Sequence, residues 1–164
     1  MSLLAVAMGL PAIADLATGN PDWQVFAGSA AVSLFVGVSL MLTTRSTSMT
    51  NLNLRQAFLL TTMSWVAVAA VGALPFAFSE LEISVADAFF ESMSGITTTG
   101  STIIVGLDNA PPGILLWRAL LQWLGGVGII VMAMAMLPIL SVGGMQLFRT
   151  CLLYTSDAAD DRMR

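Results

Sequence analysis

Three long uncharged runs constrain the fold of this chain more than any other feature of its sequence. Trp23 to Leu42, Gln56 to Phe78 and Ala119 to Phe148 contain 20, 23 and 30 residues without a charged side chain. A helix needs about 20 mostly apolar residues to cross the ~30 Å hydrocarbon core of a bilayer. The third run would be about 45 Å long as one helix, so it must tilt, bend or extend past the bilayer. The sequence therefore predicts an all-α integral membrane protein.

Composition supports a membrane environment and excludes several classes of function. Of the 164 residues, 57% are hydrophobic and 10% are charged, whereas a soluble domain carries roughly 25% charged residues. Histidine is absent and Cys151 is the only cysteine, so the usual zinc ligands and Cys/His nucleophile pairs are missing. The net charge of −4 provides no basic patch for a nucleic acid. We therefore expect a membrane-embedded chain that is not an enzyme and does not bind nucleic acid.

A short helix is predicted between the second and third runs. Ser84 to Ile96 begins with Ser84 as N-cap and Asp87 as the acid of a capping-box variant. About 12 helical residues are ~18 Å long, roughly half of the hydrocarbon core. The uncharged segment TTTGSTIIVGL follows. Irregular backbone at membrane depth is tolerated only where protein or a water-filled path surrounds it, so this order of elements predicts a re-entrant pore loop.

The start of that uncharged segment, Thr97 to Ser101, is the candidate ion-binding site. The preceding helix points the negative end of its dipole at these residues, which favours a cation there. Extended backbone can present carbonyl oxygens that replace the hydration shell of an alkali cation. Gly100 suits this role, because aligned carbonyls require dihedral angles that a Cβ disfavours.

The arginines predict the orientation of the chain. Arg45 and Arg55 flank a hydrophilic loop, and Arg149 ends the third run. Positive residues prefer the cytoplasmic side of a membrane, so these three are expected there. The pore-loop entrance is then outside, together with three acidic residues, Glu80, Glu82 and Asp108.

Arg118 is the exception, because this orientation places it near the outer end of the third run. Two interpretations remain open from the sequence. Arg118 either forms an ion pair with Asp87 or Glu91 of the short helix, or extends its side chain to the outer interface. The two acids are four residues apart and share a helix face, and no nucleophile accompanies them, so we interpret them as structural.

The two ends of the chain need separate interpretations. Residues 1–14 resemble either the apolar part of a signal peptide or a membrane helix. The helix is the better interpretation, because no basic segment precedes them. Residues 151–164, CLLYTSDAADDRMR, change character abruptly after a long apolar run and resemble the translation of a sequencing adapter. We therefore expect them to be a non-native tail.

Three ordered motifs resemble one family. LPFAFSE at 74–80, DAFFESMSGITTTGST at 87–102 and LLQWLGGVGIIVMAMAMLPILSVGGMQLFR at 120–149 resemble the Trk/Ktr potassium uptake family, most closely its TrkH-type transmembrane subunit. The resemblance implies four helix–pore-loop–helix repeats around one path, with two extra leading helices. On that plan residues 1–53 are the leading transmembrane helices and a cytoplasmic loop, 54–150 are the first repeat, and 151–164 are the non-native tail.

The same resemblance implies a function and a site. It implies potassium uptake across the cytoplasmic (inner) membrane by the N-terminal part of a channel-like transporter. The family's filter glycine matches Gly100, and its potassium-binding carbonyls match Thr98 and Thr99, with Thr97 and Ser101 adjacent. Potassium is then the bound, transported ion, and no organic cofactor is implied in this chain.

The resemblance also implies partners. These are the lipid bilayer, the remaining three repeats of the full-length chain, a second copy in a homodimer, and a cytoplasmic nucleotide-binding Trk regulatory subunit. Two alternatives stay open: a small non-transporting membrane subunit or anchor, and a homotetrameric cation channel built from a single repeat. An intramembrane enzyme is disfavoured, because no catalytic constellation is present.

Overall fold

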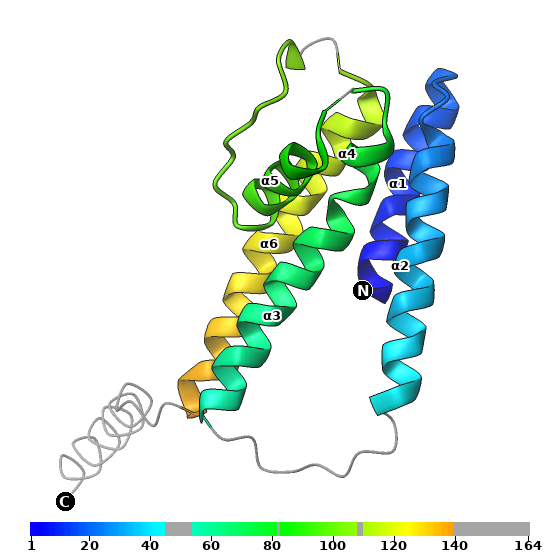
Figure 1. The fold of residues 1–164 in the computed structure, drawn as a ribbon. Coiled ribbons are helices and arrows are strands. Elements are labelled where there is room, and N and C mark those ends of the chain that lie inside the picture. Colours follow the sequence, from blue (N-terminus) through cyan, green and yellow to red (C-terminus); the bar gives the residue numbers. More distant parts are fainter. Residues whose placement is uncertain (45–53, 82, 108–109, 140–164) are drawn as a thin grey trace, which may run out of the picture. The chain divides into compact units, whose positions relative to one another are not determined.

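A computed structural model describes residues 1–44, 54–81, 83–107 and 110–139, which contain α-helices and no strand (Figure 1). Along the chain the helices are α1 (Ser2–Thr18), α2 (Trp23–Thr44), α3 (Leu54–Gly72), α4 (Leu74–Phe78), α5 (Val85–Ile96) and α6 (Pro112–Ile139). The all-α prediction is confirmed. The chain divides into units Met1–Ile129 and Ile130–Arg164, and all contacts described below lie within the first unit.

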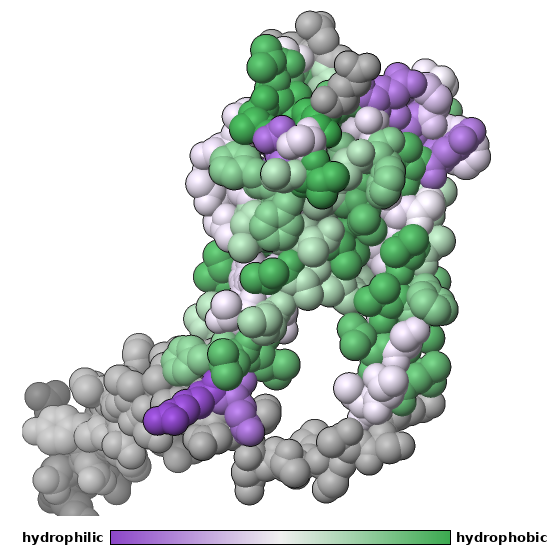
Figure 2. Space-filling view, in the orientation of Figure 1, coloured by the Kyte–Doolittle hydropathy of each residue, from purple (hydrophilic) through white to green (hydrophobic). Residues whose placement is uncertain are grey.

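Three of the described helical stretches are long and apolar enough to cross a membrane. They are Trp23–Thr44, Arg55–Phe78 and Pro112–Met134, whereas α1 is shorter. The first two match the predicted runs closely, and the third overlaps the predicted run Ala119 to Phe148, of which residues 140–148 lie outside the described residues. Figure 2 shows apolar surface along the helices and hydrophilic residues gathered at the start of α3 and at the turn between α1 and α2. The tail 151–164 lies outside the described residues.

The first two helices pack side by side as a hairpin (Figure 1). Gly19 ends α1 with φ 74°, the left-handed conformation that glycine adopts at low cost. A Cβ on Gly37 would lie 2.7 Å from the Ser2 hydroxyl oxygen, so the close approach of the two helices requires glycine there. Residues 2–14 lie in α1, an apolar helix of 17 residues that is shorter than the three candidate membrane spans.

The second run, predicted as one membrane span, is long and apolar enough to cross a membrane over Arg55–Phe78, and its helix has one interruption. It divides at Ala73 into α3 and α4. Pro75 is the physical reason, because proline has no N–H to donate to the carbonyl four residues earlier. At the break, the indole nitrogen of Trp117 donates a buried hydrogen bond of 3.0 Å to the Gly72 carbonyl. A side chain of α6 therefore pairs with the backbone where the helix is interrupted.

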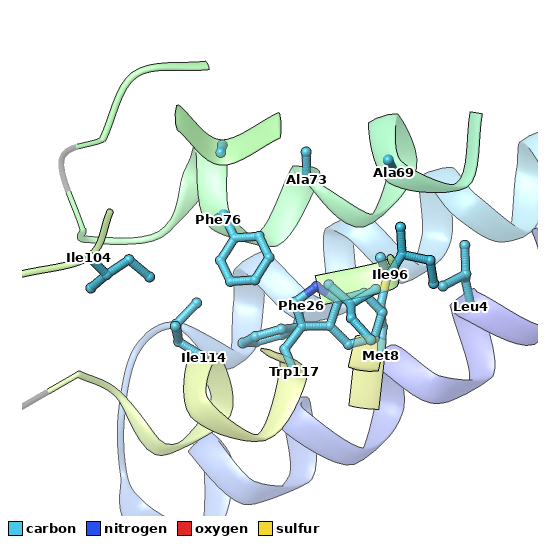
Figure 3. Packing of buried hydrophobic residues seen from close by; sticks show 12 residues of the cluster. Leu4, Met8, Phe26, Ala69, Ala73, Phe76, Ile96, Ile104, Ile114 and Trp117 are labelled. Atoms are coloured by element: carbon cyan, nitrogen blue, oxygen red, sulfur yellow. The ribbon is translucent and has the colours of Figure 1, made fainter. Parts of the chain in front are cut away.

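A hydrophobic core joins the α1–α2 hairpin to the rest of the unit. Phe26, Phe76, Ile114 and Trp117 are fully buried in it (Figure 3). The Phe26 and Trp117 rings lie 6.4 Å apart at 72°, an edge-to-face arrangement that is favourable for aromatic pairs. This packing holds the start of α6 in place, and α6 in turn positions the candidate site.

Candidate ion-binding loop

The short helix α5 begins where the sequence predicts. The amide of Asp87 donates to the Ser84 hydroxyl oxygen at 3.2 Å, and the Ser84 amide donates back to the Asp87 carboxylate at 3.3 Å. This reciprocal pair is a capping box. With 12 residues, α5 has the half-membrane length expected of a pore helix.

Glycines allow α5 to lie directly against its neighbours. It contacts α3 on one side. On the α6 side, a Cβ on Gly125 would overlap the Ile96 carbonyl oxygen, and a Cβ on Gly95 would lie 3.0 Å from the Leu121 Cβ. A backbone carbonyl cannot rotate away as a flexible side chain can. Glycine at 125 is therefore required for the end of α5 to sit beside the middle of α6.

The loop after α5 turns its amide groups back toward the helix. The N–H groups of residues 97–100 all donate to carbonyls of residues 93–95, at distances from 2.9 to 3.3 Å. Among the described residues every peptide bond is trans, so the carbonyl of each peptide unit points opposite to its N–H. The carbonyls of Thr97, Thr98 and Thr99 therefore point away from α5, and no described residue donates a hydrogen bond to them.

Two residues of this turn have left-handed backbone conformations. Thr98 has φ 59° and Gly100 has φ 79°, and Thr99 between them does not share this conformation. Alternating the handedness of successive residues orients neighbouring peptide groups the same way. Positive φ in a β-branched residue is an outlier, and such strain, ~1–3 kcal/mol, is concentrated at functional sites. Only the glycine adopts this conformation without that cost.

The return segment of the loop, residues 101–104, is held to α5 by side chains. The Ser94 hydroxyl donates to the Ser101 carbonyl at 2.6 Å. The Glu91 carboxylate accepts from the Thr102 hydroxyl and from the Ile103 amide, both at 3.2 Å. The Ser101 carbonyl is thus occupied, unlike the Thr97 carbonyl. The sequence places Thr97 and Ser101 equally beside the site, but in the structure only the Ser101 carbonyl accepts a hydrogen bond from α5.

Arg118 forms an ion pair, one of the two interpretations that the sequence leaves open, and its partner is Glu91. Its Nε lies 2.5 Å from Glu91 Oε1, and the two side chains are 14% and 0% exposed. Asp87, the other candidate, instead accepts a hydrogen bond from the Ser84 hydroxyl at the N-terminus of α5. The structure therefore decides against simple extension of Arg118 to the interface. The sequence did not predict that Glu91 also holds the loop, although its placement one turn before Ser94 on the same helix face is a usable signal.

The turn lies beside the middle of the third membrane-spanning helix. A Cβ on Gly126 would contact the Thr98 methyl at 3.9 Å, and a Cβ on Gly100 would contact the Gln122 amide nitrogen at 3.4 Å. Both α6 residues are near the centre of the span Pro112–Met134. Sequence reasoning missed Gln122 as a neighbour of this turn.

This geometry can supply part of a coordination shell for a cation. Residues 97–102 are exposed in this chain, and the carbonyls of 97–99 face away from the helix that supports them. The described residues contain no cluster of three or more His, Cys, Asp or Glu residues that could hold a metal ion. Neutral backbone oxygens at the negative end of a helix dipole suit a weakly held monovalent cation.

Comparison with known proteins identifies related sequences. The family model described as "Cation transport protein" (TrkH) matches residues 22–154. The Trk system potassium uptake protein TrkH of Escherichia coli K12 is 45% identical over 148 residues, 90% of this chain. TrkI of Halomonas elongata is 42% identical over 148 residues, and TrkG of Escherichia coli K12 is 33% identical over 149 residues. The chain spans about 30% of the length of these relatives.

Proposed function

Since this chain belongs to the TrkH family of cation transport proteins, we propose that it is the N-terminal part of a potassium uptake transporter. The family agrees with the motif resemblance and with the prediction that the chain is not an enzyme, because the relatives are named as potassium uptake proteins. The chain covers 30% of the length of its Escherichia coli relative. Potassium uptake is therefore proposed for the longer protein to which this segment corresponds.

The orientation of the loop carbonyls is the single observation that supports this proposal most. With their amides bonded to the end of α5, the carbonyls of residues 97–99 face the open side of the loop. In the proposed site, Thr98 and Thr99 supply oxygens to potassium, and Gly100 allows the turn that aligns them. Thr97 joins them, whereas the occupied Ser101 carbonyl does not. The remaining repeats would complete the coordination shell.

The proposed organisation follows from this site. Residues 1–53 are the leading helices with a cytoplasmic loop, and residues 54–150 are the first repeat, in which α3 and α6 flank the pore helix. In an inner membrane with Arg55 on the cytoplasmic side, the pore loop opens outward. The membrane potential then drives potassium inward with ~2.3 kcal/mol per charge per 100 mV. Other residues used for this orientation, Arg45, Glu82, Asp108 and Arg149, lie outside the described residues.

The proposed partners are the bilayer, three further repeats, a second copy of the full-length protein and a cytoplasmic nucleotide-binding Trk regulatory subunit. Potassium is the proposed transported ion, with no organic cofactor in this chain. The membrane embedding has support in the three apolar helices. The protein partners rest on family resemblance.

A chimera tests the function directly. Residues 1–150 would replace the aligned segment of Escherichia coli K12 TrkH, to which the chain is 45% identical, in a strain lacking its own potassium uptake systems. We expect growth at limiting potassium and uptake of rubidium, a potassium substitute. A chimera that reaches the membrane at the abundance of the parent TrkH but takes up no rubidium would contradict the proposal.

Gly100→Ser in the chimera tests the site. A side chain at φ 79° strains the turn and approaches Gln122, so we expect rubidium uptake to fall about tenfold or the preference for potassium over sodium to be lost. Gly106→Ser is the matched control, because Gly106 has φ 74° in the same loop but lies beyond the turn. Unchanged flux and unchanged potassium preference in Gly100→Ser would remove the filter assignment.

A further inference from the structure

Glu91 connects three parts of the molecule through one carboxylate. The residue is 1% exposed. Its Oε1 faces Arg118 of α6, and its Oε2 accepts from Thr102 and Ile103 of the loop. A buried carboxylate must be compensated by charge and hydrogen bonds. Arg118 supplies the opposite charge, and Thr102 and Ile103 supply hydrogen-bond donors.

The two parts of the loop are held to α5 in different ways. The turn itself, residues 97–100, is held by its own backbone amides. The return segment, residues 101–104, depends on side chains: Ser94 binds the Ser101 carbonyl, and Glu91 binds Thr102 and Ile103. Within this segment the Thr102 hydroxyl accepts from the Ile104 amide at 3.1 Å. The return segment follows directly after Gly100, so its path fixes how the turn closes.

We propose that Glu91 and Arg118 are a positioning pair, which fixes the return segment, residues 101–104, against α6 and thereby sets the ion preference of the turn. This inference rests on the proposed function of the loop. Neither residue touches the ion in this arrangement. Both act through the loop, because the carboxylate that pairs with Arg118 of α6 also accepts from the Thr102 hydroxyl and the Ile103 amide.

Because the groups around the Glu91 carboxylate are all donors or a cation, we expect even a substitution of the same shape to displace residues 101–104. Glu91→Gln keeps the side-chain shape, but it places an NH2 group against either the Arg118 guanidinium or the donors of Thr102 and Ile103. In the chimera, we expect Glu91→Gln to lower the preference for rubidium over sodium about tenfold, with a raised KM for rubidium at equal membrane abundance. Arg118→Lys keeps the charge and should retain more of the preference than Arg118→Met.

Two variants make the comparison specific. Asp87→Asn is the matched control, because Asp87 lies one turn earlier on α5 and bonds to its cap rather than to the loop, so we expect an unchanged ion preference. Thr102→Val is a milder second test, since it removes one donor to Glu91 and no charge. We expect an intermediate loss of preference, measurable even if Glu91→Gln fails to reach the membrane.

A structural readout separates this inference from the proposed function. Amide exchange at Ile103 in the purified chimera should rise more than tenfold in Glu91→Gln and stay unchanged in Asp87→Asn, whether or not the protein transports ions. Unchanged exchange at Ile103 would overturn the positioning role. So would an unchanged rubidium-to-sodium preference in Glu91→Gln when Gly100→Ser abolishes it. A chimera without any uptake, but with the expected exchange, would instead contradict the proposed function.

Discussion

At the scale of single residues, Asp22 carries a charge that the fold disfavours. It lies between α1 and α2 and is 2% exposed. Burial raises the pKa of the Asp22 carboxyl above its ordinary value of 3.8, and the nearby Glu80 carboxylate raises this pKa further. A hydrogen bond from the Glu80 amide opposes the increase. The Oδ2 oxygen of Asp22 has no hydrogen-bond partner among the described residues.

This environment predicts how stability depends on pH. Because the pKa of Asp22 is raised by folding, its contribution to stability is greatest below pH 3.8 and is lost as pH rises through the raised pKa. Asp22→Asn removes the charge and keeps an acceptor for the Glu80 amide. We expect the variant chimera to melt at a higher temperature than its parent near pH 7.5, with the difference shrinking toward pH 4. A difference that grows toward low pH would be the contrary result.

At the scale of elements, the start of α6 is fixed by a residue of α1. The Gly113 amide donates to Asp15 Oδ1 at 2.7 Å in a buried position. A carboxylate at a helix N-terminus binds free amides and interacts favourably with the dipole. A Cβ on Gly113 would overlap the Asp15 carboxylate. Glycine at 113 therefore permits a cap that comes from another helix.

Asp15→Ala should loosen this junction. The change leaves the Gly113 amide buried without its acceptor, at a cost of ~1–3 kcal/mol. We expect a lower melting temperature of the purified chimera and a lower membrane abundance. Asp15→Asn, which keeps an acceptor oxygen, should recover most of the loss. Equal melting temperatures for Asp15→Ala and the unsubstituted chimera would show that the hydrogen bond does not hold the junction.

Elements with local signals could be predicted from the sequence, and those with distant partners could not. The spanning helices follow from charge-free runs, and α5 follows from Ser84 and Asp87, which are three residues apart. The hydrogen bond from the Gly113 amide to Asp15 joins residues separated by 98 positions, and no local sequence pattern predicts it. Within the candidate site, the sequence leaves Arg118 either paired with Asp87 or Glu91 or extended to the interface. The pairing with Glu91 and the hydrogen bond from the Ile103 amide to Glu91 depend on packing between distant elements.

At the scale of the whole molecule, the loop lies at a depth where its backbone needs protection from lipid. An uncharged threonine loop lies beside the middle of a membrane-spanning helix, with exposed residues and carbonyls that accept no hydrogen bond from the described residues. Such backbone is not stable against lipid. We therefore expect the longer protein to cover the loop or to surround it with a water-filled path, as the proposed four-repeat arrangement would.

Direct observation of the ion tests the central claim. Crystals of the chimera grown with rubidium would show bound rubidium by its anomalous scattering. We predict a peak in contact with the carbonyl oxygens of Thr98 and Thr99, and its loss in Gly100→Ser. A chimera that transports rubidium but has its anomalous peaks elsewhere in the protein, with none at this turn, would contradict the assignment of residues 97–100 as the ion-binding site.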